Sequence, residues 1–188
     1  MIRAGKVVAI PTETLYVLVA DPFNLNAIAS VFLAKGRELH RSLPILVDSM
    51  QMAEDYSTKL TSRFYLLARR FWPGPLTIIV PASTLLPLKV TGNTGRLALR
   101  QSSAAIPNEL IRRLGMPVIA TSANVSGQPT CRSGAEVLGT MDGRVHLVID
   151  AGGCGGAGAT TVDITEPDWK LIREGALPRH MIEECLRA

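Results

Sequence analysis

The sequence predicts one α/β domain over residues 1–188, built on a mixed sheet with both parallel and antiparallel strands. Two observations predict this fold class. Apolar, β-branched runs alternate along the whole chain with segments in which apolar residues recur at helical spacing. Several connections between the apolar runs are too short for a helical crossover, so some neighbouring strands must be antiparallel. A hydrophobic content of 47% in 188 residues supplies enough side chains for one large core.

Each predicted element follows from its period and from the residues that bound it. Apolar runs predict strands at 6–11, 15–20, 42–47, 76–81, 96–100, 116–120, 147–150, 160–165 and 170–175. Helical spacing predicts helices at 25–34, 50–56, 59–71, 106–114 and 179–186, and a Ser133/Glu136 capping box predicts one more short helix. Asn24 and Ser49 are suited to cap two helix starts, and Gly115 ends a third helix. The segment 82–95 has no clear period and is predicted to be irregular.

Composition narrows the class of protein. The net charge of +4 permits an anionic ligand such as a nucleotide or RNA but does not require one. Cys131, Cys154 and Cys185 are odd in number and widely spaced, which argues against a disulfide framework and against a zinc site. No apolar stretch reaches the roughly 20 residues of a transmembrane helix, and no signal-peptide core follows Met1. We therefore expect a cytoplasmic protein with reduced thiols, no zinc and no membrane association.

A cationic corner follows the helix predicted to end at residue 34. Lys35 and Arg37 flank Gly36, and the glycine allows a sharp turn and the close approach of a ligand. An ammonium and a guanidinium at such a turn suit a phosphate or a carboxylate. The triplet also fits a plain helix end, in which Gly36 is the cap and the two cations complement the helix dipole. Both interpretations stay open on these residues alone.

Two polar clusters lie at strand ends, where loops often carry function. Thr12, Glu13 and Thr14 separate the first two predicted strands, and turn chemistry explains them equally well. The second cluster, 121–127, leaves a strand with three hydroxyl groups and one amide, and its terminal glycine argues against a following helix. We interpret the second cluster as a ligand-binding loop rather than as a helix cap.

Arg100 is a third candidate for ligand contact. Alternation in its strand places Leu97 and Leu99 on one face and Arg96 and Arg100 on the other, with Arg100 at the strand end and Arg96 expected to be solvated. The glycine-rich segment 151–158 precedes a strand rather than a helix, so it is not a dinucleotide-binding turn. It is interpreted either as a phosphate-wrapping loop or as a plain linker.

Six motifs together resemble the YrdC/TsaC family in order and spacing over nearly the whole chain. They are Pro11-Thr12-Glu13-Thr14-Leu15-Tyr16, Lys35-Gly36-Arg37, Trp72-Pro73-Gly74-Pro75, Arg100, Ser122-Ala123-Asn124-Val125-Ser126-Gly127 and Ile172-Arg173-Glu174-Gly175. The resemblance implies a twisted mixed sheet with helices around a large, positively charged cleft. It also implies a short, single-domain L-threonylcarbamoyladenylate synthase, a nucleotidyltransferase. Such an enzyme converts L-threonine, bicarbonate and ATP to threonylcarbamoyl-AMP and pyrophosphate, for N6-threonylcarbamoyladenosine at tRNA position 37.

The resemblance also implies roles for individual residues. Lys35 and Arg37 are implied as catalytic residues that gather the carbamate and the phosphates. Thr12, Arg100 and Ser122 are implied to bind threonine, with Arg100 as the partner of its carboxylate. The implied ATP contacts are Lys35, Arg37, Thr121, Ser122, Asn124, Thr160 and Arg173. Because the cationic corner is expected to face the cleft, replacing Lys35 or Arg37 with alanine is expected to abolish synthesis without unfolding the protein.

The implied reaction needs no metal held by the protein and no protein nucleophile. Mg²⁺ is expected to arrive with ATP, because no cage of carboxylates is visible in the sequence. The unstable product is expected to pass to the tRNA threonylcarbamoyltransferase machinery, and direct tRNA binding by the basic cleft is a further expectation.

Three departures from the family pattern affect the expected site. Val17 and Val19 stand where glycines are usual and would narrow a pocket beside them. Residues 101–104, Gln-Ser-Ser-Ala, replace a Pro-Asp-His run after Arg100, and Ala159 replaces a serine. These changes leave the Lys-Arg and Ser-Asn pairs intact.

Three alternative functions compete with the synthase. A tRNA or double-stranded RNA-binding protein would use the same cleft, but the modest charge and the lack of aromatic residues among the basic ones disfavour it. A YciO-type paralogue would act on another substrate. Carbamoyl transfer, as in the hydrogenase-maturation carbamoyltransferases, is disfavoured because their acylphosphatase and zinc-finger segments are missing.

Overall fold

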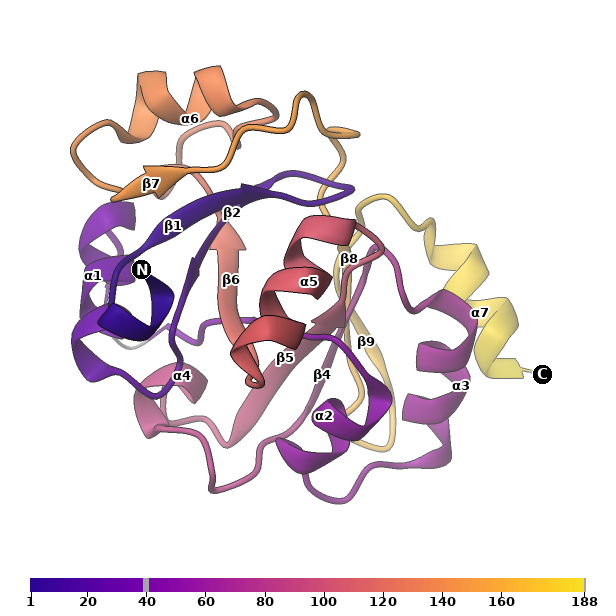
Figure 1. The fold of residues 1–188 in the computed structure, drawn as a ribbon. Coiled ribbons are helices and arrows are strands. Elements are labelled where there is room, and N and C mark those ends of the chain that lie inside the picture. Colours follow the sequence, from indigo (N-terminus) through magenta and orange to yellow (C-terminus); the bar gives the residue numbers. More distant parts are fainter. Residues whose placement is uncertain (39–40, 188) are drawn as a thin grey trace.

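One continuous mixed sheet of nine strands runs through the computed structural model, which describes residues 1–38 and 41–187. The strands lie in the order β7-β1-β2-β6-β3-β5-β4-β8-β9 (Figure 1). The pairs β1/β7, β3/β5 and β4/β8 are parallel, and the other neighbours are antiparallel. The strands are β1 (Val8–Pro11), β2 (Tyr16–Ala20), β3 (Ile45–Val47), β4 (Leu76–Pro81), β5 (Arg96–Gln101), β6 (Val118–Ser122), β7 (Leu147–Val148), β8 (Thr160–Asp163) and β9 (Lys170–Arg173). The predicted α/β class with a mixed sheet is confirmed.

Helices cover the two faces of the sheet unequally. They are η1 (Ile2–Ala4), a 3₁₀ helix, and the α-helices α1 (Leu25–Lys35), α2 (Met50–Asp55), α3 (Ser62–Phe71), α4 (Leu88–Thr91), α5 (Ala105–Leu114), α6 (Gly134–Met141) and α7 (Arg179–Arg187). The larger core takes its helical side chains from every α-helix except α5. In Figure 1, α5 lies in front of the sheet beside β6, and α7 packs against α3 at the other end. One face of the sheet is therefore closed, and the other is only partly covered.

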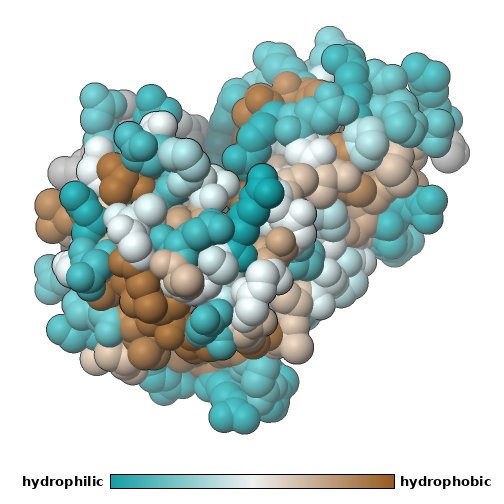
Figure 2. Space-filling view, turned by 90° about the horizontal axis from the view of Figure 1, so that it is seen from above, coloured by the Kyte–Doolittle hydropathy of each residue, from teal (hydrophilic) through white to brown (hydrophobic). Residues whose placement is uncertain are grey.

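Strand alternation decides which residues meet each face. Tyr16 and Leu18 of β2 belong to the larger core, whereas Val17 and Val19 pack with Ile111 of α5 in the smaller one. The smaller core ends at the middle of the sheet because α5 reaches no further. Beyond it, the same face of strands β5, β4 and β8 borders an open cavity. The space-filling view from above shows hydrophilic side chains on two lobes with a notch between them, and a hydrophobic patch at the lower left (Figure 2).

The ends of α1 form as the sequence predicts. The Asn24 side chain accepts hydrogen bonds from the backbone N–H groups of Asn26 (3.0 Å) and Ala27 (3.1 Å), which caps the first turn. Gly36 closes the helix in the left-handed conformation, at φ 57°, and its N–H donates to the Leu33 carbonyl. The chain therefore turns sharply after Lys35, as the glycine predicts.

Some element boundaries differ from the predictions. The irregular segment 82–95 contains the one-turn helix α4, and α3 starts at Ser62 rather than at 59, because Lys59 takes a left-handed conformation at φ 50°. The capping box before α6 is only half formed: Ser133 accepts from the Glu136 N–H, but the Glu136 carboxylate accepts from the N–H of Arg132. Within the described residues, no helix combines the length and the hydrophobicity that a membrane span requires.

Candidate active site

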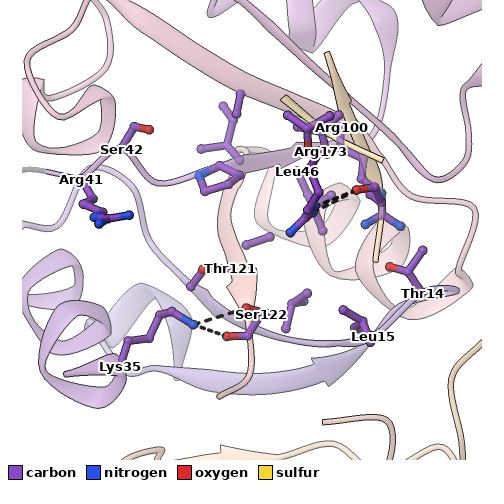
Figure 3. Close-up of a pocket in the computed structure, with 18 of the residues that line it drawn as sticks. Thr14, Leu15, Lys35, Arg41, Ser42, Leu46, Arg100, Thr121, Ser122 and Arg173 are labelled. Atoms are coloured by element: carbon purple, nitrogen blue, oxygen red, sulfur yellow. Dashed lines mark hydrogen bonds between the residues drawn. The ribbon is translucent and has the colours of Figure 1, made fainter. Parts of the chain in front are cut away.

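A cavity of about 500 Å³ lies on the partly covered face of the sheet. Five cations are among the described residues that line it, and no aspartate or glutamate is. The cations are Lys35, Arg37, Arg41, Arg100 and Arg173. Figure 3 shows Arg41 and Ser42 at one end of the cavity, Arg100, Arg173 and Thr14 at the other, and Thr121 and Ser122 between them. A volume in the range of ligand sites and a wholly cationic set of charges fit an elongated anion.

The Lys35 side chain is a buried anchor in the floor of the cavity. Its Nζ atom lies 2.6 Å from the Ser122 carbonyl oxygen, 3.1 Å from the Asn124 carbonyl oxygen and 3.0 Å from Asn124 Oδ1. Only 4% of the residue is exposed. The Ser122 hydroxyl is a fourth, more distant acceptor at 3.4 Å, so the three donors of the ammonium group are all engaged and Lys35 ties the end of α1 to the end of β6 and the loop after it (Figure 3).

Burial, and to a smaller extent the neighbouring charge of Arg37, together lower the pKa of Lys35 to about 8. Within the described residues, its hydrogen-bond acceptors are carbonyl, amide and hydroxyl oxygens, and none is a carboxylate. Lys35 is therefore a cation near neutral pH whose charge is lost in mildly alkaline solution.

The Ser122 and Asn124 side chains are engaged with each other and with the loop. The Ser122 hydroxyl donates to Asn124 Oδ1 at 2.6 Å, and Asn124 Nδ2 donates to the carbonyls of Val125 and Gln128. Both residues line the cavity, as predicted, but their polar atoms already have partners. The loop is therefore held rigid by its own side chains, and the Ser-x-Asn motif shapes the cavity floor.

Arg37 is held more loosely than Lys35. Its half-buried side chain makes a long hydrogen bond, 3.4 Å from Nη2 to the carbonyl of Ser42, within the part of the chain that the structure describes. Burial lowers the pKa of Arg37 and the charge of Arg41 adds to that effect, yet a guanidinium stays protonated. The two guanidinium groups thus repel each other at one end of the cavity, which favours an anion between them.

Arg100 forms the opposite wall of the cavity. Its Nη2 lies 2.7 Å from Oε1 of Glu13, and its Nε donates to the Gly74 carbonyl at 3.1 Å. Burial raises the pKa of Glu13, but the Arg100 charge and hydrogen bonds from Ser102 and Arg100 outweigh burial, so the net pKa is lowered. The prediction that Leu97 and Leu99 face the core and Arg100 the opposite side is confirmed.

Two predicted site residues are not in the lining of the cavity. The Thr12 hydroxyl donates to the Leu15 carbonyl (2.8 Å) and accepts the N–H groups of Thr14 and Leu15, so it closes a turn. Thr160 is fully buried, and its hydroxyl donates to the Leu177 carbonyl and accepts from Gly175 and Leu177. The structure thus places both hydroxyl groups inside turns rather than at the cavity wall.

Arg173 and the glycine-rich segment meet beside the cavity. The Arg173 guanidinium donates twice to the Ala159 carbonyl, from Nη2 (2.9 Å) and Nε (3.2 Å). The segment 151–158 packs on the turn between β1 and β2, with the N–H of Gly156 donating to the Thr14 carbonyl. Gly175 is required there because a Cβ atom would lie 2.1 Å from the carbonyl oxygen of Gly158. In this structure the segment 151–158 supports the turn between β1 and β2, which borders the cavity.

Thr14 and Ser126, members of the two predicted polar clusters, also line the cavity. Sequence reasoning missed further polar residues of the lining, namely Arg41, Ser42, Thr77 and Thr161. Thr77 and Thr161 are paired across β4 and β8, and Thr77 interrupts an otherwise apolar run. A lone hydroxyl residue inside a buried strand was the signal that could have found Thr77, because such a residue needs a polar neighbour or a ligand.

The departures from the family pattern have different consequences. Val17 lines the cavity, whereas Val19 packs in the smaller core away from it, so only the first valine narrows the site. Ala159 supplies the carbonyl that Arg173 binds. Ser102, in the segment that replaces Pro-Asp-His, donates a hydrogen bond to Glu13.

Comparisons with known proteins agree with this geometry. The family model Sua5/YciO/YrdC, described as "Telomere recombination", matches residues 1–175. Threonylcarbamoyl-AMP synthase of Pyrococcus abyssi is 38% identical over 186 residues, which are 98% of this chain and 55% of that protein. The Bacillus subtilis enzyme of the same name is 33% identical over 188 residues, or 99% of this chain and 54% of that protein.

A solved structure of P. abyssi Sua5 complexed with L-threonine superposes with a TM-score of 0.95 and 38% identity, over 98% of this chain and 55% of that one. This chain spans about half the length of these relatives. The expectation that residues 1–188 form a short, single-domain version therefore stays a prediction. The match over residues 1–175, together with the fold and the cationic cavity, shows that the chain belongs to the Sua5/YciO/YrdC family.

Proposed function

We propose that the cavity binds ATP and L-threonine and that the chain is a threonylcarbamoyl-AMP synthase, a nucleotidyltransferase. The observation that carries this proposal is the charge of the lining: five cations and no acidic side chain among the described residues. Relatives of that name and a related structure with L-threonine support the same activity. ATP, a carbamate and bicarbonate are all anions, so one cationic cavity attracts each of them.

The proposed reaction has two steps. The amine of threonine adds to the carbon of bicarbonate, and a carbamate forms with loss of water. A carbamate oxygen then attacks the α-phosphorus of ATP, the bond from that phosphorus to the bridging oxygen breaks, and pyrophosphate leaves. The second step brings two anions together, and the cations offset their repulsion and the charge that develops on the leaving group. No protein nucleophile is needed.

The geometry supports a division of roles among the predicted residues. Arg37 and Arg41 line one end of the cavity, where their guanidinium groups are placed to contact the phosphates. Arg100 is at the other end, and its Nη1, which has no partner among the described residues, is placed to bind the carboxylate of threonine. Lys35 lies in the floor of the cavity, where its charge acts on both the phosphates and the carboxylate. Thr121 lines the cavity between the two ends, and Arg173 closes the wall on the threonine side.

Metal, location and downstream partners complete the proposal. No group of three or more His, Cys, Asp or Glu in the described part of the chain could hold a metal ion. Mg²⁺ is proposed to arrive bound to the phosphates of ATP, as part of the substrate. The product carries a reactive mixed anhydride, so a tRNA-modifying partner in the cytoplasm is proposed to consume it.

Pyrophosphate release tests the proposal. The purified chain is incubated with ATP and Mg²⁺, and L-threonine or bicarbonate is left out in turn. We expect release only when both are present. Release that needs neither co-substrate, or tRNA binding with no release, would contradict the proposed activity.

A further inference from the structure

The wall around Arg100 contains a carboxylate that the proposed reaction does not use. Glu13 forms an ion pair with Arg100, one of the cations of the cavity. Its Oε1 atom lies 2.7 Å from Arg100 Nη2 in an ion pair that lacks hydrogen-bond geometry, and it accepts a hydrogen bond from the Ser103 N–H (3.2 Å). Its Oε2 atom accepts from the Ser102 hydroxyl. The carboxylate is thus held on both oxygens.

The opposite side of the Arg100 guanidinium is also fixed. Arg100 Nε donates to the Gly74 carbonyl, so two of its three nitrogens have protein partners, and Nη1 has none among the described residues. Only 9% of the Arg100 side chain is exposed, so the group has little room to swing. Nη1 is therefore the donor that the wall leaves for a ligand.

Ser102 links this arrangement to a rigid element. Its hydroxyl accepts the Ala104 N–H at 3.2 Å, and its carbonyl accepts from the Asn108 side chain at 2.8 Å, at the start of α5. The bonds run from α5 through Ser102 and Glu13 to Arg100. A guanidinium held in this way loses little conformational entropy when a carboxylate binds to it.

Resting on the proposed function, we infer that Glu13 and Ser102 are positioning residues that aim Arg100 at the carboxylate of threonine. Neither of them contacts the substrate. Glu13 also reduces the attraction of Arg100 for anions in general, because its negative charge partly offsets that of the guanidinium group. The site therefore holds its guanidinium in one orientation but has a smaller net positive charge. Threonine recognition should therefore depend on Glu13 and Ser102, and ATP recognition at the far end should not.

Titration calorimetry tests this inference. L-Threonine and a nonhydrolysable ATP analogue are titrated separately into wild type, Glu13→Gln and Ser102→Ala. We expect the threonine Kd to rise about tenfold in Glu13→Gln and about threefold in Ser102→Ala, since a charge-assisted bond is stronger than a neutral one. The Kd of the ATP analogue should stay within about twofold of wild type in both variants.

Matched controls separate positioning from loss of fold. Ser103→Ala changes the neighbouring side chain and keeps the N–H that Glu13 accepts, so it should bind threonine like wild type. Glu109→Gln removes a surface carboxylate paired with Arg112 and Arg113 and should also have no effect. Threoninamide, which lacks the carboxylate, should bind wild type and Glu13→Gln equally weakly.

The outcomes are distinguishable from failure of the proposed function. If wild type binds no threonine, the proposed function fails and the variants are not needed. If wild type binds threonine and a folded Glu13→Gln variant binds it equally well or more tightly, Glu13 does not position Arg100 and the inference is wrong. Equal weakening of threonine and of the ATP analogue would show a general structural role and would also overturn it.

Discussion

Two buried cations border the same cavity and are stabilised in opposite ways. Lys35 is surrounded by neutral oxygens, whereas Arg100 is paired with the carboxylate of Glu13. Burial without a counter-charge lowers the pKa of Lys35 to about 8, so its charge can be lost. Arg100 keeps a fixed charge with a fixed direction. The comparison shows that a cationic site can combine one group that shapes a loop with another that is aimed at a ligand.

The largest effect is expected from Lys35→Met, because it removes both a charge and an anchor. Synthase activity should fall more than about 100-fold, since a charge near the reacting phosphate is lost. The free energy of unfolding should fall by about 2 kcal/mol, because the acceptors on Ser122 and Asn124 lose their donor. Burial of Lys35 thus revises the sequence-based expectation that its removal spares the fold.

Chemical denaturation measures the expected loss of stability, and the pyrophosphate assay measures the expected loss of activity. Lys59→Met serves as the control, because Lys59 is an exposed lysine away from the cavity and should change neither quantity. A Lys35→Met protein as stable as wild type would contradict the anchoring role.

Arg37→Ala should give a comparable loss of activity with no loss of stability. We expect kcat to fall about 100-fold, as when one donor to a developing negative charge is removed. The free energy of unfolding should stay within about 0.5 kcal/mol of wild type, because the hydrogen bond of its side chain to the described part of the chain is long, at 3.4 Å. A melting temperature measured beside kcat separates this result from that of Lys35→Met. A destabilised Arg37→Ala protein would mean that Arg37 is a structural cap.

The two cations should also respond differently to pH. Affinity for an ATP analogue should fall up to about tenfold as the pH rises through 8, because Lys35 loses its charge. Its folded pKa of about 8 lies below its ordinary value of 10.5, so this group costs stability below pH 8 and the cost is relieved between pH 8 and 10.5. The affinity loss therefore cannot come from unfolding through Lys35.

Titrations at pH 7 and pH 9 measure this effect. Lys35→Met should show a flat profile over the same range. A wild-type affinity that is equal at pH 7 and pH 9 would show that the charge of Lys35 does not contribute to binding of the ATP analogue.

The smallest effect on activity is expected from the two threonines outside the cavity. Thr160→Val should lower the free energy of unfolding by about 1–2 kcal/mol, because three hydrogen bonds of its hydroxyl are lost in a buried turn. Thr12→Val should do the same for the turn at Leu15. The KM values for ATP and threonine should stay within about twofold of wild type. A selective rise in the threonine KM of Thr12→Val would restore Thr12 to the binding site.

Strand and helix periods, the Asn24 cap and the glycine after Lys35 were predictable because each rests on local chemistry. The gathering of the Lys35–Arg37 corner, Arg100 and Arg173 around one cavity followed from the family resemblance, since these three sites are far apart in the sequence. The hydrogen-bond partners of the site side chains were not predictable. A threonine beside a turn has the same sequence signature whether its hydroxyl binds a ligand or its own backbone, as Thr12 illustrates.

The central claim is that one cavity joins threonine, bicarbonate and ATP. The most direct measurement is mass spectrometry of the product formed from ¹³C-bicarbonate, L-threonine and ATP by wild type and by Arg37→Ala. We predict an AMP adduct of threonine carrying one ¹³C atom in wild type and almost none in the variant. An adduct without the label, or AMP and pyrophosphate formed without any adduct, would contradict the account.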